Sequence, residues 1–240
     1  MSTLSGLTTT ATVKQETDSV GGFILDSDAY LMQIELAYMN KSKGGATSLT
    51  VHLKSADGKK LKNTLWVTSG DKKGNKITYT DRNKNEVHLP GYVIANHICL
   101  LTVGKEIHQL STETKKINLY DFDLGKEVLT DVECITEIMG KTIIAGVIKQ
   151  TVDKNVKDAS DNYVPSGETR DENEIDKVFS AADKRTVVEI RAEATEPAFL
   201  EKWTDKWKGV SKNKSKASGA QKGAPAGNVN AAPQTSLFNS

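Results

Sequence analysis

Several residue types are scarce in this chain, and each scarcity excludes a class of protein. The 240 residues include two cysteines, Cys99 and Cys134, five prolines and 6% aromatic residues. Two cysteines cannot form a disulfide framework, so we expect both to stay reduced in an intracellular protein. Residues 1–10 lack the basic start and apolar core of a secretory signal. The longest apolar run, residues 92–103, is interrupted by polar residues and is too short to cross a bilayer.

No excess of one charge identifies a partner, because 32 basic residues face 31 acidic ones. The distribution is uneven, however: residues 208–240 hold five lysines and no acid, which leaves residues 1–207 at a formal charge of −4. We expect residues 209–240 to be a disordered basic tail with an apolar tip, Leu237-Phe238. Residues 1–20 are rich in Ser and Thr and are expected to be flexible. The domain would then span residues 21–208.

The first half of the domain alternates apolar and polar residues with the period of a β-strand. The predicted strands lie around residues 30–38, 49–53, 61–67 and 76–80, and turn residues separate them. In the first of them the pattern places Tyr30, Met32, Ile34, Leu36 and Tyr38 on one face. The segment therefore predicts an antiparallel meander.

A helical period follows over residues 92–101, after Pro90-Gly91 and before Gly104. Beyond it we predict a strand at 117–121, a short helix at 132–139, a strand at 142–152, a loop at 153–171, a strand at 186–193 and a helix at 197–208. The pattern of residues 186–193 also fits a helix. The order favours a mainly β fold: a small, partly open antiparallel barrel with an inserted helix and a C-terminal helix.

No motif indicates an enzyme, a cofactor or a metal. Gly140-Lys141-Thr142 resembles the end of a phosphate-binding loop. That loop requires a glycine at position 135, where this chain has Ile135. The four histidines and two cysteines show no metal-ligand spacing. Acidic residues at 121–133 and 171–174 leave a metal-dependent nuclease as an alternative, although a solvated surface or loop is the better explanation in a chain with 26% charged residues.

The remaining signal is a basic stretch with interspersed aromatic residues. Residues 54–86 contain nine basic and four acidic residues, although the chain up to residue 207 is net negative. On the strand around Trp66, the residues Lys62 and Thr64 share the face of the indole, which suits base stacking beside neutralised phosphates. The alternative is that Trp66 and Tyr79 cap the barrel and the lysines keep the turns soluble. The candidate phosphate contacts are Lys54, Lys59, Lys60, Lys62, Lys72, Lys73, Lys76 and Arg82, and the candidate stacking rings are Trp66, Tyr79 and Tyr120.

Several short segments, taken in their order along the chain, resemble single-stranded-DNA-binding proteins of tailed bacteriophages. They include Ser55-Ala56-Asp57-Gly58-Lys59-Lys60, Lys76-Ile77-Thr78-Tyr79, Leu89-Pro90-Gly91-Tyr92 and Glu113-Thr114-Lys115-Lys116. The similarity covers residues 20–190 and includes no catalytic motif. It implies an OB-fold that binds single strands with little base preference in phage replication, recombination or repair, in the cytoplasm of the infected bacterium.

The tail tip and the C-terminal helix have two interpretations each. In many single-strand binders a tail with an apolar tip recruits replication or recombination proteins, and Leu237 and Phe238 would do so here. The familiar tail is acidic whereas this one is basic, and a simple linker end is the alternative.

Residues 199–207 form an apolar stripe through Trp203, which favours docking on the barrel over contact with DNA or another subunit. A virion structural or assembly protein is the competing function.

Overall fold

Strands dominate the computed structural model, which describes residues 24–121, 124–158 and 163–216. The fold is mainly β, with 48% strand, an antiparallel sheet of eight strands and three α-helices. The elements are β1 (Asp28–Lys41), β2 (Thr47–Ser55), β3 (Lys60–Trp66), η1 (Asp71–Lys73), β4 (Thr78–Thr80), β5 (Glu86–His88), α1 (Pro90–Val103), η2 (Ile107–Gln109), β6 (Glu113–Asp121), β7 (Lys126–Cys134), η3 (Thr136–Ile138), β8 (Thr142–Lys157), β9 (Tyr163–Ser180), α2 (Val187–Arg191), α3 (Phe199–Trp207) and β10 (Lys212–Asn213).

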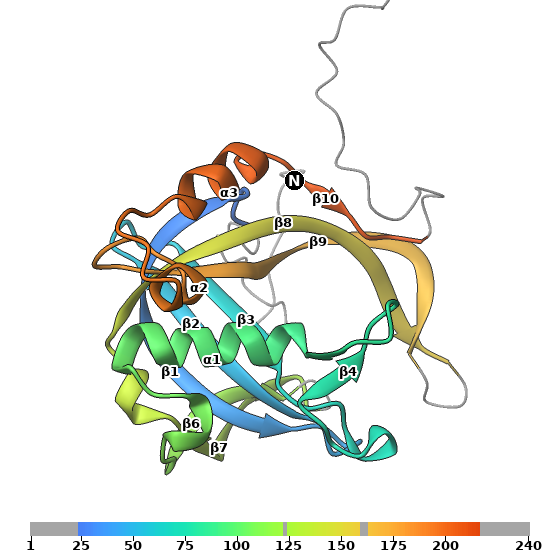
Figure 1. The fold of residues 1–240 in the computed structure, drawn as a ribbon. Helices are drawn as coiled ribbons and strands as arrows, with labels where there is room; N and C mark the ends of the chain where they lie inside the picture. Colours follow the sequence, from blue (N-terminus) through green and yellow to red (C-terminus); the bar gives the residue numbers. More distant parts are fainter. Residues whose placement is uncertain (1–23, 122–123, 159–162, 217–240) are drawn as a thin grey trace, which may run out of the picture.

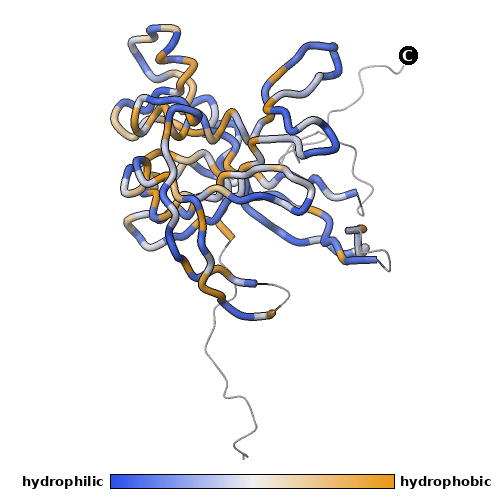
Figure 2. Tube along the Cα trace, turned by 90° about the horizontal axis from the view of Figure 1, so that it is seen from below, coloured by the Kyte–Doolittle hydropathy of each residue, from blue (hydrophilic) through white to orange (hydrophobic). Residues whose placement is uncertain are grey.

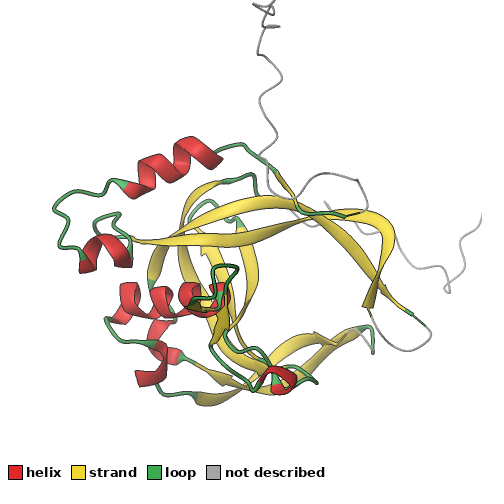
Figure 3. Ribbon diagram, turned by 45° about the vertical axis from the view of Figure 1, so that its right-hand side comes forward, coloured by secondary structure: helices red, strands yellow, loops and turns green. Residues whose placement is uncertain are grey.

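The sheet curves around a central helix (Figures 1 and 3). Its strand order is β10-β8-β1-β2-β3, with β9 paired to β8 and the β6–β7 hairpin joined to β1 through β7. The short β10 runs parallel to β8. Over the described ranges the sheet does not close into a barrel. Two of its edge strands, β3 and β9, nevertheless touch. The Asn63 side-chain Nδ2 on β3 donates to the main-chain oxygen of Asn173 on β9 at 3.2 Å.

The main core lies between the concave face of the sheet and α1. Alternate residues of β1, β2 and β3 point inward, and Ile94, Ala95 and Ile98 of α1 pack against them. Figure 2 shows apolar residues gathered in the body of the molecule and polar ones along the projecting hairpins. Burial of this apolar surface is the main stabilising contribution to the fold.

A bulge in β1 overturns the prediction that five alternate residues share one face. The pairing of β1 with β2 shifts register between Ile34 and Leu36. The inserted residue reverses which side chains point inward. Ala37 therefore enters the main core, and Tyr38 packs on the other face with Val132 and Cys134 of β7.

The inserted helix is confirmed as α1. Pro90 occupies its first turn, where a missing N–H costs nothing, and Gly104 ends it with φ 70°. Gly91 is required by close packing, because a Cβ there would lie 2.3 Å from the main-chain oxygen of Trp66. The helix start and the end of β3 are therefore held directly against each other.

Three predicted elements are wrong. Residues 132–139 are the end of β7 and the short turn η3 instead of a helix. In the predicted loop at 153–171, residues 153–157 and 163–171 belong to strands β8 and β9, whose polar outer halves project beyond the core and lack the apolar alternation of a covered strand. Residues 159–162 of that prediction lie outside the described residues. The predicted strand at 186–193 is helix α2, which begins with a reciprocal capping box between Thr186 and Glu189.

The C-terminal helix α3 docks on the sheet, which confirms the interpretation of its apolar stripe. Trp203 is 3% exposed and packs with Ile144, Ile148 and Phe179. Its indole Nε1 donates to Asp176 at 2.8 Å. No helix in the described ranges is long and apolar enough to cross a membrane.

Residues 209–216 are ordered, which corrects the prediction of a disordered segment from residue 209. Lys212 and Asn213 pair with β8, the Lys214 N–H donates to the Thr151 oxygen at 2.8 Å, and Ser215 is 4% exposed. Main-chain bonds to a strand edge need no apolar side chains, so composition alone missed this contact. The tip residues Leu237 and Phe238 and the N-terminal residues 1–20 lie outside the described residues.

His97 on α1 makes stability depend on pH. Burial, with Arg191 and Lys177 nearby, lowers its pKa from 6.5 to about 4. The fold favours the neutral ring, so this contribution is complete above pH 6.5 and is lost as the pH falls toward 4. Between pH 7 and pH 4.5 the free energy of unfolding should fall in both proteins. We expect the fall to be about 1–2 kcal/mol smaller in His97→Gln than in the wild type, after allowance for the partial exposure of the ring. Urea denaturation at both pH values measures it.

His108 provides the matched control, since its side chain is 67% exposed. His108→Gln removes an exposed ring that lies 3.5 Å from Glu106, and it should change the pH dependence less than His97→Gln does. An equal change in both variants would contradict the assignment to His97.

Candidate nucleic-acid interface

A groove runs between β3 and β9, two edge strands of the sheet that meet there. It consists of two adjoining hollows of about 580 and 560 Å³, which share the residues Asn63, Thr64, Trp66, Glu172 and Asn173. The first hollow also reaches the start of α1 and Gln150 of β8, and the second reaches Lys60, Lys62 and Arg170. The size is in the range of sites that hold small ligands or parts of polymers.

Trp66 lies where the two hollows join and is 47% exposed. The predicted alternation of β3 is confirmed: Leu61 and Leu65 are 6% and 5% exposed in the core, whereas Lys62 and Trp66 face outward. The tight contact of Gly91 with the Trp66 main chain fixes the base of the ring. An indole held in this way offers a flat apolar surface to a ligand.

The hollow on the side of Lys60 is basic. Lys60, Lys62 and Arg170 line it against one acid, Glu172, whose carboxylate lies 3.2 Å from the Arg170 guanidinium. Lys60 and Lys62 form no ion pair with any described residue. Their charges are therefore available to an anion from solvent.

The other hollow has the opposite character. Glu172, Glu174 and Asp176 of β9 line it with one lysine, Lys177. All three carboxylates have partners: Glu172 binds Arg170 and Gln150, Glu174 binds Lys214 at 2.6 Å, and Asp176 accepts the indole N–H of α3. The groove thus has a basic end and an end rich in hydrogen-bond acceptors.

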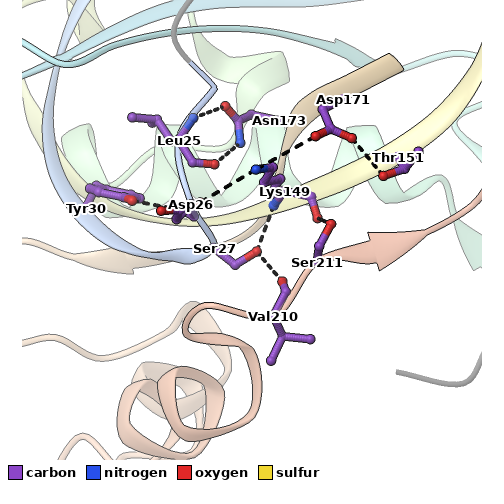
Figure 4. A network of polar contacts seen from close by, with 10 residues as sticks. All are labelled: Leu25, Asp26, Ser27, Tyr30, Lys149, Thr151, Asp171, Asn173, Val210 and Ser211. Carbon is purple, nitrogen blue, oxygen red and sulfur yellow. Dashed lines mark hydrogen bonds and ion pairs between the residues drawn. The ribbon is translucent and has the colours of Figure 1, made fainter. Parts of the chain in front are cut away.

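A polar network fixes the position of β9 and hence the width of the groove (Figure 4). The Asn173 amide binds both the N–H and the C=O of Leu25, each at 2.8 Å. Lys149 lies 3.8 Å from both Asp26 and Asp171. Ser27 accepts from the Lys149 N–H and donates to the Val210 oxygen, which ties both terminal segments to β8.

The structure brings three of the predicted residues to the groove, namely Lys60, Lys62 and Trp66. Lys54 and Lys59 lie near its basic end but are paired, Lys54 with Glu35 at 3.4 Å and Lys59 with Asp57 at 2.7 Å. The hydrogen bonds from Lys59 and Ser55 lower the pKa of Asp57 to about 2, so this pair is ionised at neutral pH. Of these four lysines, the two that form no ion pair with a described residue, Lys60 and Lys62, line the groove.

Another predicted group lies on the segment between β3 and α1, which forms an arm beside the groove. Its basic members, Lys72, Lys73, Lys76 and Arg82, are exposed. Tyr79 is 45% exposed on the β4–β5 hairpin. The arm is anchored at the groove, because His88 lines the first hollow and the Leu89 N–H donates to the Ile77 oxygen.

Tyr120 is not part of this surface. It is 53% exposed on β6, which is joined to the sheet through β7 and β1. Two strand positions, β1 and β2, separate β7 from β3. Tyr120 therefore provides a distant control position for the groove.

The β9 side of the groove was missed from the sequence, as were Asn63 and Gln150. Arg170, Glu172 and Asn173 fall in or beside the segment predicted as a loop. One signal was available, because a structureless loop of that length is uncommon within a compact domain. The signal would have indicated an element there, although not its contact with β3.

The described residues hold no group of three His, Cys, Asp or Glu side chains placed to bind a metal ion. Cys99 and Cys134 are both buried and free, and burial raises the pKa of Cys99 to about 12. Comparison of the chain with models of protein families, with curated proteins and with solved structures finds no match in any of the three.

Proposed function

We propose that the chain is a non-enzymatic protein that binds single-stranded DNA through the groove between β3 and β9. In this proposal the curved sheet is a partly open barrel of the OB type, and the gap between its free strands receives the ligand. The observation that supports it most is that the half-exposed Trp66 ring lines the same hollow as Lys60 and Lys62, which form no ion pair with a described residue. The arrangement combines a stacking surface with phosphate-binding charge.

The ligand's path follows from the distribution of charge. Lys60, Lys62 and Arg170 would bind phosphates at the basic end, and the arm would add the charges of Lys72, Lys73, Lys76 and Arg82 with Tyr79 as a second ring. An unpaired strand fits this pattern better than a duplex, since stacking on Trp66 needs an exposed base. Such a protein would act in phage DNA replication, recombination or repair in the host cytoplasm, and the tail beyond residue 216 would contact partner proteins there.

A gel shift with single- and double-stranded oligonucleotides, with and without magnesium, tests the proposal. We expect the single strand to be shifted intact and the duplex to bind more weakly. Absence of any shift would favour a virion structural protein, and cut product would favour a metal-dependent nuclease.

The two groove lysines should account for part of the salt dependence of binding. Each phosphate contact on a single strand contributes about 0.7 to the slope of log affinity against log salt concentration. We expect Lys60→Ala and Lys62→Ala each to lower the slope by roughly that amount. Fluorescence titration with oligo-dT over a salt series measures it.

Lys126→Ala, at an exposed position on β7, is the control for overall charge. It should leave the slope unchanged. A loss of slope equal to that of Lys62→Ala would mean that binding depends on net charge and not on the groove.

A further inference from the structure

Two amide side chains at the acceptor-rich end of the groove have unused oxygens. Gln150 of β8 and Asn63 of β3 both line the hollow that also contains Trp66. Gln150 is 5% exposed. Its Oε1 and the Oδ1 of Asn63 are buried and accept no hydrogen bond from any residue that the structure describes.

The hydrogen-bond partners of the two amide groups determine which atom of each is the nitrogen and which is the oxygen without a donor. Gln150 Nε2 donates to the Glu172 carboxylate at 2.9 Å, and Asn63 Nδ2 donates to the main-chain oxygen of Asn173 at 3.2 Å. An ionised carboxylate and a carbonyl only accept hydrogen bonds, so the nitrogens must face them. The oxygens are therefore the free atoms in both side chains.

A buried acceptor without a donor is costly, because it has given up its hydrogen bonds to water and gained none in return. Two in one hollow indicate a site that is completed by a molecule with N–H or O–H donors. Glu174 and Asp176 line the same hollow and also favour donors over anions. A phosphate is disfavoured at this end, whereas a flat ring with an amino group matches both the acceptors and Trp66.

We propose that this end of the groove holds the edge of one nucleobase, whose exocyclic amino group donates to Gln150 Oε1 while its ring lies beside Trp66. The inference rests on the proposed function and deepens it. Cytosine, adenine and guanine present such a group, whereas thymine has no exocyclic amino group, and the two carbonyl oxygens that flank its N3–H are repelled by the amide oxygens. One base position of this kind gives a modest preference within otherwise unselective binding.

Oligo-dC and oligo-dT of equal length are the matched probes, because both are pyrimidines, at pH 8 where cytosine is neutral. We expect the wild-type protein to bind oligo-dC about tenfold more tightly, since one unpaired buried polar group is at stake. Gln150→Met keeps the length of the side chain and removes the acceptor. It should abolish the preference, so that the ratio of the affinities for oligo-dC and oligo-dT falls to about one.

Equal wild-type affinities for the two oligonucleotides would overturn this inference and leave the proposed function standing, whereas binding to neither would overturn both. If Gln150→Met does not fold, an oligonucleotide of N4,N4-dimethylcytosine provides the test without a variant. It lacks the N–H donors and should bind the wild-type protein no better than oligo-dT. Affinity equal to that of oligo-dC would overturn the inference.

Discussion

Trp66→Ala should weaken binding to oligo-dT by about tenfold to a hundredfold, since a stacked base contributes roughly 1–3 kcal/mol. The ring is 47% exposed and adds little to the core, so the free energy of unfolding should change by less than about 1 kcal/mol. Fluorescence titration at fixed salt measures the affinity, and urea denaturation measures the stability. The combination of lost binding with retained stability is the result that the groove predicts.

Trp66→Phe and Tyr120→Ala are the controls for this result. Phenylalanine keeps a flat ring and should retain most of the affinity. Tyr120 is an exposed ring outside the groove, so its removal should have no effect. Unchanged affinity in Trp66→Ala would place the ligand elsewhere, and an equal loss in Tyr120→Ala would indicate a general aromatic effect.

Local patterns were sufficient where one face of an element is covered. The alternation of β3 predicted which residues point outward, because a strand with one buried face must have a period of two. The helix α1 was predicted for a similar reason, with Pro90 and Gly104 marking its ends. In both cases the residues that decide the structure are neighbours in the sequence.

The sequence did not predict three features that lack a simple pattern of one covered and one exposed face: the outer half of β9, the helix α2 and the bulge in β1. The outer half of β9, from Tyr163 to Arg170, is mostly exposed and has no apolar face to reveal its period. In α2 the capping box Thr186–Glu189 was the informative signal, and an apolar pattern that also fits a strand obscured it. The bulge in β1 depends on its pairing with β2 and is not encoded in the alternation itself.

The candidate site shows the same division. Its β3 side follows from a local pattern of Lys60, Lys62 and Trp66. Its other side comes from β9, more than 100 residues later, and the two strands meet through the Asn63–Asn173 hydrogen bond. Such a contact between distant segments depends on the whole sheet, so the unpaired amide oxygens could be found only in the structure.

Trp203→Ala should have the largest effect on stability, a loss of about 3–5 kcal/mol, because it empties a buried aromatic site. The indole packs with Phe179, Ile144 and Ile148. It also lies over Gly146, where a Cβ would come within 3.0 Å of the ring. Urea denaturation at pH 7 measures the loss, which includes the partner that Asp176 would no longer have.

Trp203→Phe separates packing from the hydrogen bond, since it keeps most of the ring and should cost no more than about half as much. At temperatures and urea concentrations where it is folded, Trp203→Ala should bind oligo-dT with an affinity within about threefold of wild type. The reason is that Lys60, Lys62 and Trp66 lie on β3, whereas Trp203 contacts β9. Trp66 and Trp203 would then have separate roles, in binding and in stability. Loss of binding in a folded Trp203→Ala protein would instead show that α3, through Asp176 of β9, sets the shape of the groove.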